Sequence, residues 1–249
     1  MTQGTHTVRS YDEELRRLEN LIAEMGGLAE VQLAAAMQAL IRRDSEKAFE
    51  IAANDERIDM LETRIDHQAV SLLALRQPMA QDLREIIGAL KASSMIERVG
   101  DYAKNVAKRT AAIIEYPPVP PAQSIARIGQ LAQEMIKDVL DAYLARDLEK
   151  AEHVRERDRE LDALYTSVFR ELLTYMMEDP RNITPATHIL FIAKNLERVG
   201  DHATNLAELV YFIVRGRIPP DERMKNDTSS YAVAEHPMKA LPKDEEGRS

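Results

Sequence analysis

A five-residue peptide that occurs twice, one hundred positions apart, constrains the fold of this chain more than any other feature. The peptide Glu-Arg-Val-Gly-Asp stands at residues 97–101 and again at residues 197–201. Both copies lie in stretches whose apolar residues recur every three or four positions, which is typical of helices. The identity therefore indicates a tandem duplication. It also places a Glu and an Asp one helical turn apart in each half of the chain.

The composition favours long packed helices. Aromatic residues make up 5% of the 249-residue chain and tryptophan is absent, whereas Ala, Leu, Met, Glu and Arg are abundant. Two units of about 100 to 125 residues can each bury a core without disulfides. The chain has no cysteine, which fits a reducing compartment and excludes thiolate metal sites and cysteine nucleophiles.

Charge and hydropathy limit the possible partners. The formal net charge is −9 and the isoelectric point is about 5.3, which argues against a nucleic-acid partner because such proteins present clustered Lys and Arg. No apolar run approaches the ~20 residues that span a bilayer, and the polar N-terminus lacks the apolar core of a secretory signal. We therefore expect a soluble cytoplasmic protein that reaches a membrane only through its partners.

The spacing of apolar residues predicts three helices in each half. Pro78 and Pro180 end the second helix of each half, because the residue before a proline avoids the helical region. Gly26 and Gly27 interrupt the first helical pattern, which predicts a close approach of another helix or a bend. The helices are expected near residues 15–40, 45–76 and 78–116 in the first half, and near 125–139, 147–179 and 185–215 in the second.

The predicted fold class is therefore all-α, with two tandem three-helix bundles that arose by internal duplication. A run rich in proline separates the bundles and forms a stiff, extended linker. Beyond the second bundle, Pro, Asp, Ser, Lys and Glu dominate, which is typical of a disordered tail. The predicted units are a first bundle at 10–116, the linker at 117–121, a second bundle at 122–216 and the tail at 217–249.

Carboxylates four residues apart lie on one face of a helix, and such pairs occur on two predicted helices of each half. The two pairs of a half lie at similar distances from the proline break between their helices, so an antiparallel hairpin brings them to similar heights. Glu62 and Asp66 follow on roughly the same side of the middle helix. The pairs are Asp55 and Asp59 with Glu97 and Asp101 in the first half, and Asp158 and Asp162 with Glu197 and Asp201 in the second.

Four facing carboxylates repel one another unless a cation or protons neutralise them. Ligation by oxygen alone suits hard cations such as Mg²⁺, Ca²⁺, Mn²⁺ or ferric iron. Gly100 and Gly200, beside the Asp of each repeated peptide, leave room for a neighbouring helix or a bridging water. These observations predict one metal site in each half.

Two other interpretations stay open. A carboxylate-bridged di-metal enzyme would use the same acids, but the chain lacks the Glu-x-x-His spacing of ferritin-like di-iron bundles. A metal-free helical scaffold would carry the acids as a solvated face. The absence of a GxxxxGK[ST] loop leaves nucleotide hydrolysis without a visible site, and we predict that the protein is not an enzyme.

Together these motifs resemble the PhoU family of bacterial regulators of phosphate transport. The resemblance covers about residues 10–216. It rests on the two copies of the repeated peptide and on further stretches, namely Met-Gly-Gly at 25–27, Arg-Gln-Pro at 76–78, Asp-Leu-Arg at 82–84 and Leu-Thr-Tyr-Met-Met-Glu-Asp at 173–179.

The resemblance implies a non-catalytic cytoplasmic protein that forms homodimers and represses the phosphate-starvation (Pho) response. It implies an adaptor between the ATPase of the phosphate ABC transporter (Pst) and the sensor histidine kinase PhoR. The metal motifs of the family correspond to the eight acids above, and the metals associated with them are iron, zinc, manganese and magnesium. The tail after Pro219 is not part of the shared pattern.

Overall fold

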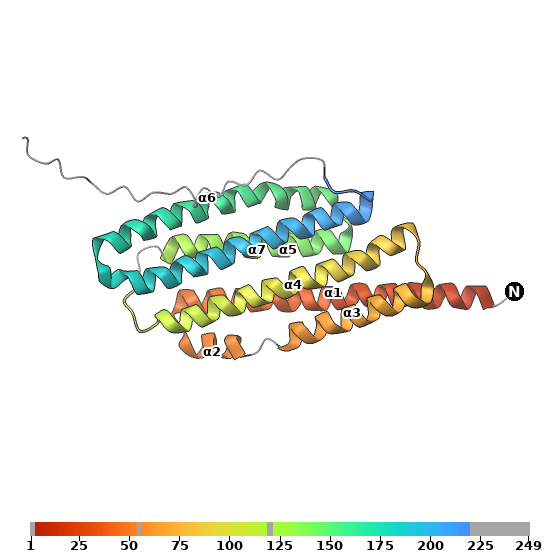
Figure 1. Cartoon of the computed structure of the whole chain (residues 1–249), viewed down its shortest axis with the longest axis horizontal. Coiled ribbons are helices and arrows are strands. Elements are labelled where there is room, and N and C mark those ends of the chain that lie inside the picture. The colour runs from red at the N-terminus through yellow and green to blue at the C-terminus, as the bar shows by residue number, and fades with distance from the viewer. Residues whose placement is uncertain (1–2, 54–55, 119–121, 220–249) are drawn as a thin grey trace, which may run out of the picture.

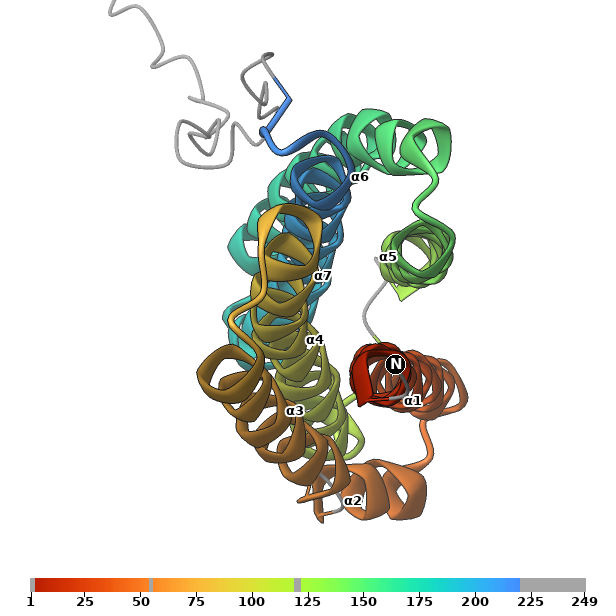
Figure 2. The ribbon, with the colours of Figure 1, turned by 90° about the vertical axis from the view of Figure 1, so that its right-hand side faces the viewer.

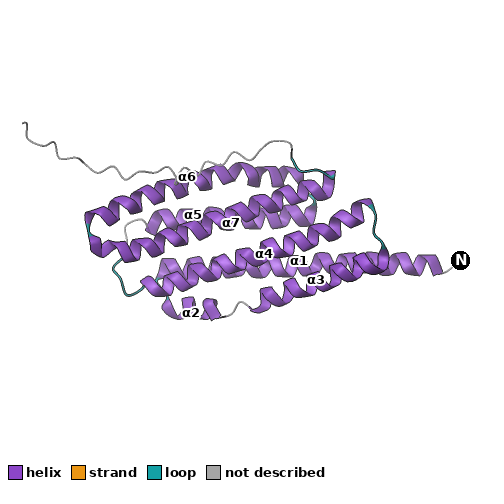
Figure 3. Cartoon of the chain, in the orientation of Figure 1, coloured by secondary structure: helices purple, strands orange, loops and turns teal. Residues whose placement is uncertain are grey.

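The computed structural model describes residues 3–53, 56–118 and 122–219, and these residues form helices joined by short turns, with no strand among them (Figures 1 and 3). The elements are α1 (Gln3–Arg42), α2 (Ser45–Ala53), α3 (Glu56–Arg76), α4 (Ala80–Ile113), α5 (Ala122–Ala145), α6 (Leu148–Glu178), the 3-10 turn η1 (Pro180–Asn182) and α7 (Ile183–Arg215).

The all-α prediction is confirmed, with two differences in the helices. The single helix expected at 45–76 is described as two, α2 and α3, and residues 54–55 between them lie outside the described part of the chain. The first helix is longer than expected and continues through Gly26 and Gly27 without interruption. Most of the predicted linker, at 119–121, and most of the predicted tail, at 220–249, lie outside the described residues.

Local signals in the sequence explain the helix ends at corresponding places in the two halves. Asp44 accepts a hydrogen bond from the backbone N–H of Lys47 at 3.0 Å, so it caps α2. Asp147 caps α6 in the same way, because it accepts from two backbone N–H groups. The residues before these caps, Arg43 and Arg146, have φ of 55° and 56°, which is the left-handed conformation that ends a helix.

The two halves lie side by side and share one core. In the first half α4 packs against α1, α2 and α3, and in the second half α7 packs against α5 and α6. Figure 2 shows the two groups of helices end on, with α4 beside α7 and α1 beside α5. Buried apolar residues form a continuous cluster across both interfaces. This shared core fixes how the two repeats sit against each other.

Equivalent contacts at the α1/α5 interface repeat the duplication in three dimensions. A Cβ added to Gly26 of α1 would lie 2.7 Å from Cδ2 of Leu140, and a Cβ added to Gly129 of α5 would overlap the Met37 side chain. Gly129 lies 103 positions after Gly26, and Leu140 lies 103 positions after Met37. The same close contact is therefore made twice, as expected for two repeats related by a two-fold rotation. The prediction that the glycine pair permits close helix approach is confirmed for Gly26.

The α4/α7 interface places the two copies of the repeated peptide near its centre. Tyr102 and His202, one residue beyond each copy, have ring centroids 5.6 Å apart. Since these residues are one hundred positions apart, their contact lies on the axis that relates the halves. The acidic pairs of the two copies therefore belong to equivalent positions on either side of that axis.

Candidate functional site

The first acidic cluster, as we define it, consists of Asp59, Glu62, Glu97 and Asp101 on the adjacent helices α3 and α4. Burial, followed by the negative charge of Asp101, raises the pKa of Glu97 from its ordinary value of 4.5 to about 7. The Glu62 carboxylate adds to this effect, and the Arg98 guanidinium opposes it. The geometry therefore concentrates negative charge around the Glu97 carboxyl group, whose side chain is 19% exposed.

Glu62 is a member of this cluster that the predicted site did not include. Burial raises its pKa first, and the charges of Asp66, Asp59 and Asp101 raise it further. The signal in the sequence was its position three residues after Asp59, which keeps it on the same side of α3. Glu62 of α3 therefore lies beside the predicted acids of α4, whereas the pairing of Asp55 and Asp59 with those acids stays a prediction.

The raised pKa of Glu97 predicts that the metal-free protein loses stability as the pH rises. Below about pH 4.5 Glu97 is protonated in both the folded and the unfolded chain, so it has no effect there. Between 4.5 and about 7 the unfolded chain releases this proton while the folded chain retains it, so the free energy of unfolding falls by about 2 to 3 kcal/mol. Denaturant unfolding in a chelator, at half-unit pH steps, measures this slope.

The matched variants are Glu97→Gln and, on the exposed face of α1, Glu13→Gln. Glu97→Gln is expected to flatten the stability profile between pH 4.5 and 7, because the amide has no proton to lose. Glu13→Gln is expected to retain the wild-type slope. An unchanged slope in Glu97→Gln would show that Glu97 is not the titrating group.

The second acidic cluster consists of Asp158, Asp162, Glu197 and Asp201 on α6 and α7. The first three of these residues are 2%, 1% and 3% exposed, respectively, so this cluster is more deeply buried than the first. A Cβ added to Gly200 would overlap the Leu161 side chain and lie 3.7 Å from Oδ1 of Asp158. The absence of a side chain at Gly200 thus lets the α7 backbone approach the acids of α6, as predicted.

A lysine distinguishes the second cluster from the first. Nζ of Lys194 lies 2.9 Å from Oε2 of Glu197 and 4.9 Å from the centroid of the Tyr165 ring. In the first half the equivalent positions are Ser94 and Glu62. The cation beside the repeated glutamate therefore differs between the clusters. It is Lys194, at 2.9 Å from Glu197, in the second cluster, and Arg98, at 3.6 Å from Glu97, in the first. The sequence signal was the spacing of three residues between Lys194 and Glu197, which suits a helical ion pair.

Seven of the eight predicted metal ligands are described, and Asp55 lies outside the described residues. The carboxylates come from two adjacent helices in each half, and oxygen donors of this kind suit a hard cation. Within the described part of the chain, no group of three or more Asp, Glu or His side chains is arranged to hold a metal ion. Metal binding therefore stays a prediction.

The helices and acidic clusters define a class of protein, an all-helical chain of two repeated bundles with paired acids on the facing helices of each repeat. The PhoU domain matches residues 22–110 and 125–210. The chain belongs to the PhoU family. Among the described helices, none is long and apolar enough to cross a membrane.

Known proteins resemble the chain over most of its length. A protein of Rhizobium meliloti (strain 1021) named phosphate-specific transport system accessory protein PhoU homolog is 50% identical over 226 residues, which cover 90% of this chain and 95% of that protein. A protein of the same name from Xylella fastidiosa (strain Temecula1 / ATCC 700964) is 52% identical and covers 90% of this chain and 94% of its own length.

Two solved structures share the fold. The crystal structure of PhoU from Pseudomonas aeruginosa has a TM-score of 0.81 and 40% identity, and the match covers 83% of this chain and 99% of that one. The crystal structure of the phosphate transport system regulatory protein PhoU from Streptococcus pneumoniae has a TM-score of 0.79 and 28% identity, covering 84% and 99% of the two chains. The fold and the tandem arrangement of bundles are therefore those of PhoU proteins.

Proposed function

We propose that this protein is a regulator of phosphate uptake that keeps the phosphate-starvation response silent when phosphate is plentiful. The observation that carries this proposal is the 50% identity to a phosphate-transport accessory protein over 90% of the chain. The name of the Streptococcus pneumoniae structure, a phosphate transport system regulatory protein, supports a regulatory role. These names describe accessory and regulatory proteins, which favours a non-catalytic role over the di-metal enzyme.

In this proposal the protein is a cytoplasmic homodimer that connects the ATPase of the Pst transporter with the PhoR kinase. Both contacts would use the outer helix faces, because the interior of each bundle is filled. Large apolar side chains on these faces support protein contacts. Phe49, Leu75 and Met79, for example, are 64%, 76% and 80% exposed.

The acidic clusters are the proposed metal sites. Their donor set favours hard cations such as magnesium, manganese or ferric iron, and zinc is the further metal implied by the family. The buried, negatively charged surroundings of Glu97 support this part of the proposal, since a bound cation would offset both the burial and the repulsion that raise its pKa. A cation between two helices would also fix the distance between them. It would thereby set the shape of the helix surface that the partner proteins contact.

Deletion of the gene in its host tests the regulatory proposal. In medium rich in phosphate, the deletion strain is expected to express starvation-response genes as strongly as wild-type cells do without phosphate, because the kinase is no longer silenced. The measurements are transcription of a starvation-response reporter and uptake of labelled phosphate. Plasmid-borne wild-type protein is the control and is expected to restore repression. Unchanged reporter output after deletion would refute the regulatory proposal.

A further inference from the structure

Two cavities occupy equivalent places at opposite ends of the molecule. The first, of about 300 Å³, lies where the C-terminal ends of α1 and α4 meet the start of α5 and α7. The second, of about 250 Å³, lies where the C-terminal end of α5 meets the start of α1 and α4. Each contains the arginine that ends a helix in the left-handed conformation, Arg43 in the first cavity and Arg146 in the second.

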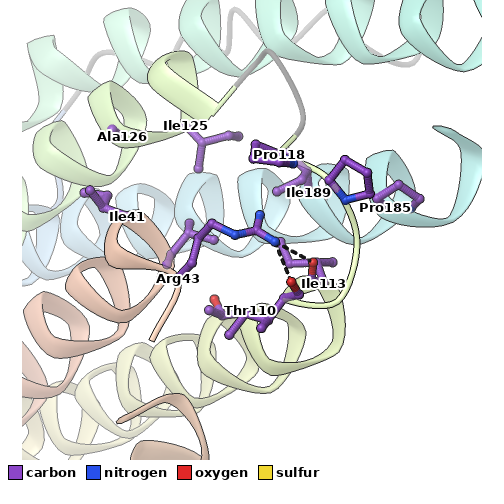
Figure 4. Close-up of a pocket in the computed structure, with 12 residues that line it drawn as sticks. Ile41, Arg43, Thr110, Ile113, Pro118, Ile125, Ala126, Pro185 and Ile189 are labelled. Carbon is purple, nitrogen blue, oxygen red and sulfur yellow. Dashed lines mark hydrogen bonds between the residues drawn. The ribbon is translucent and has the colours of Figure 1, made fainter. Parts of the chain in front are cut away.

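The linings of the two cavities differ in chemistry. Side chains of isoleucine, leucine and proline make most of the wall of the first cavity, and Arg43 is the only charged residue among its described lining residues. The second cavity contains several charged side chains, including Glu19 and Glu85. Figure 4 shows Arg43 extending towards Ile113, with dashed lines to backbone oxygens there, and Ile125, Pro118 and Ile189 on the other side of its guanidinium. The duplication thus produced one polar cavity and one apolar cavity with a single cation.

The two arginines also differ in their partners. Nη2 of Arg146 lies 2.8 Å from Oε1 of Glu19, so its charge is neutralised inside the second cavity. Nη2 of Arg43 donates to the backbone carbonyls of Ile114 and Tyr116, at 2.5 and 2.6 Å. Among the described residues, Arg43 forms no ion pair with a carboxylate. The first cavity therefore has a guanidinium held in place by neutral acceptors.

We propose that the first cavity binds a small amphipathic monoanion, an unbranched carboxylate of medium chain length. The apolar walls would cover the alkyl chain, and Arg43 would donate charge-assisted hydrogen bonds to the carboxylate. Since a water molecule occupies about 30 Å³, the cavity of about 300 Å³ has room for about ten heavy atoms, the number in octanoate. Inorganic phosphate fits poorly, because these walls offer a hydrated anion few polar groups.

The position of this cavity gives the proposed ligand a structural role that is independent of the proposed metal sites. Ile41 and Ile113 on the wall belong to the first half, and Ile125 and Ile189 belong to the second. An alkyl chain between them would contact both halves at once. Ligands in such cavities between packed helices stabilise the folded state by mass action.

Titration calorimetry with octanoate tests this proposal on the full-length protein. Octanoate is expected to bind with a dissociation constant on the order of 0.1 to 1 mM, and octanol, which lacks the negative charge, about tenfold more weakly. Arg43→Met is expected to lower octanoate affinity about tenfold, because it removes the cation and retains an apolar side chain of similar length. The matched control is Arg146→Met in the second cavity, which is expected to leave the affinity unchanged.

A second variant separates loss of the site from loss of the fold. Ala126 lines the first cavity, so Ala126→Phe is expected to fill it and abolish octanoate binding while the helical circular dichroism spectrum stays that of the wild type. Three results would overturn the proposal: no octanoate binding at millimolar concentration, equal affinity for octanol, or unchanged affinity in a folded Ala126→Phe protein. None of them would bear on phosphate regulation, which the deletion strain reports separately.

Discussion

Replacing Glu97 by Gln together with Asp101 by Asn is expected to remove at least about half of the metal that the protein binds. Both substitutions retain side-chain size and abolish the negative charge that a hard cation requires. The protein would be stripped with a chelator, loaded with Mn²⁺, desalted and measured by elemental analysis. The corresponding Ala variants at Asp101 and Asp201 are also expected to bind less metal. Unchanged metal content would show that the acids of the repeated peptide are not ligands.

The second acidic cluster supplies the comparison for this experiment. Its equivalent variant, Glu197→Gln with Asp201→Asn, is expected to lose less metal than the first-half variant, because the Lys194 ammonium already contacts Glu197. Lys194→Ser, which introduces the residue found at position 94, is expected to increase the metal bound in the second half. Asp141→Asn, on the exposed face of α5, is the control and is expected to bind the wild-type amount.

The sequence predicted the repeats, the number of bundles and the helices that carry the acids, because all of these follow from local spacing. Apolar periodicity, the prolines at 78 and 180, and the caps at Asp44 and Asp147 act within a few residues of where they stand. The sequence prediction treated 45–76 as one helix, since no proline or glycine lies between Ser45 and Arg76. It gave no weight to Asn54 and Asp55, residue types that often end and begin helices.

The missed parts of the candidate site depend on contacts between helices. Glu62 belongs to the first acidic cluster because α3 and α4 pack in one particular register, which spacing along a single helix does not specify. Lys194 contacts Tyr165 of α6 through the rotation of α7 against α6, whereas its contact with Glu197 lies within α7. The apolar cavity around Arg43 likewise depends on where four helix ends meet. Packing of distant segments decides these features, and a sequence pattern reports only the face on which each residue lies.

Gly26→Leu is expected to destabilise the protein by about 2 to 3 kcal/mol, because the added side chain overpacks the α1/α5 interface. A Cβ at this position would lie 2.7 and 3.0 Å from the two methyl groups of Leu140, whose branched end has fewer rotamers than an unbranched side chain. Gly27 is the matched control, since a Cβ there would have no atom within 4 Å. Gly27→Ala is expected to stabilise α1 by about 0.5 to 1 kcal/mol, through helix propensity alone.

The equivalent position in the second half tests whether the nature of the neighbour decides the cost. A side chain at Gly129 would meet Met37, which is unbranched and can adopt another rotamer. Gly129→Leu is therefore expected to destabilise the protein by less than Gly26→Leu, by about 1 kcal/mol. Guanidinium unfolding followed by circular dichroism measures all three variants. A Gly26→Leu protein as stable as Gly27→Ala would show that helix α1 does not approach α5 as closely at Gly26 as the two-fold arrangement requires.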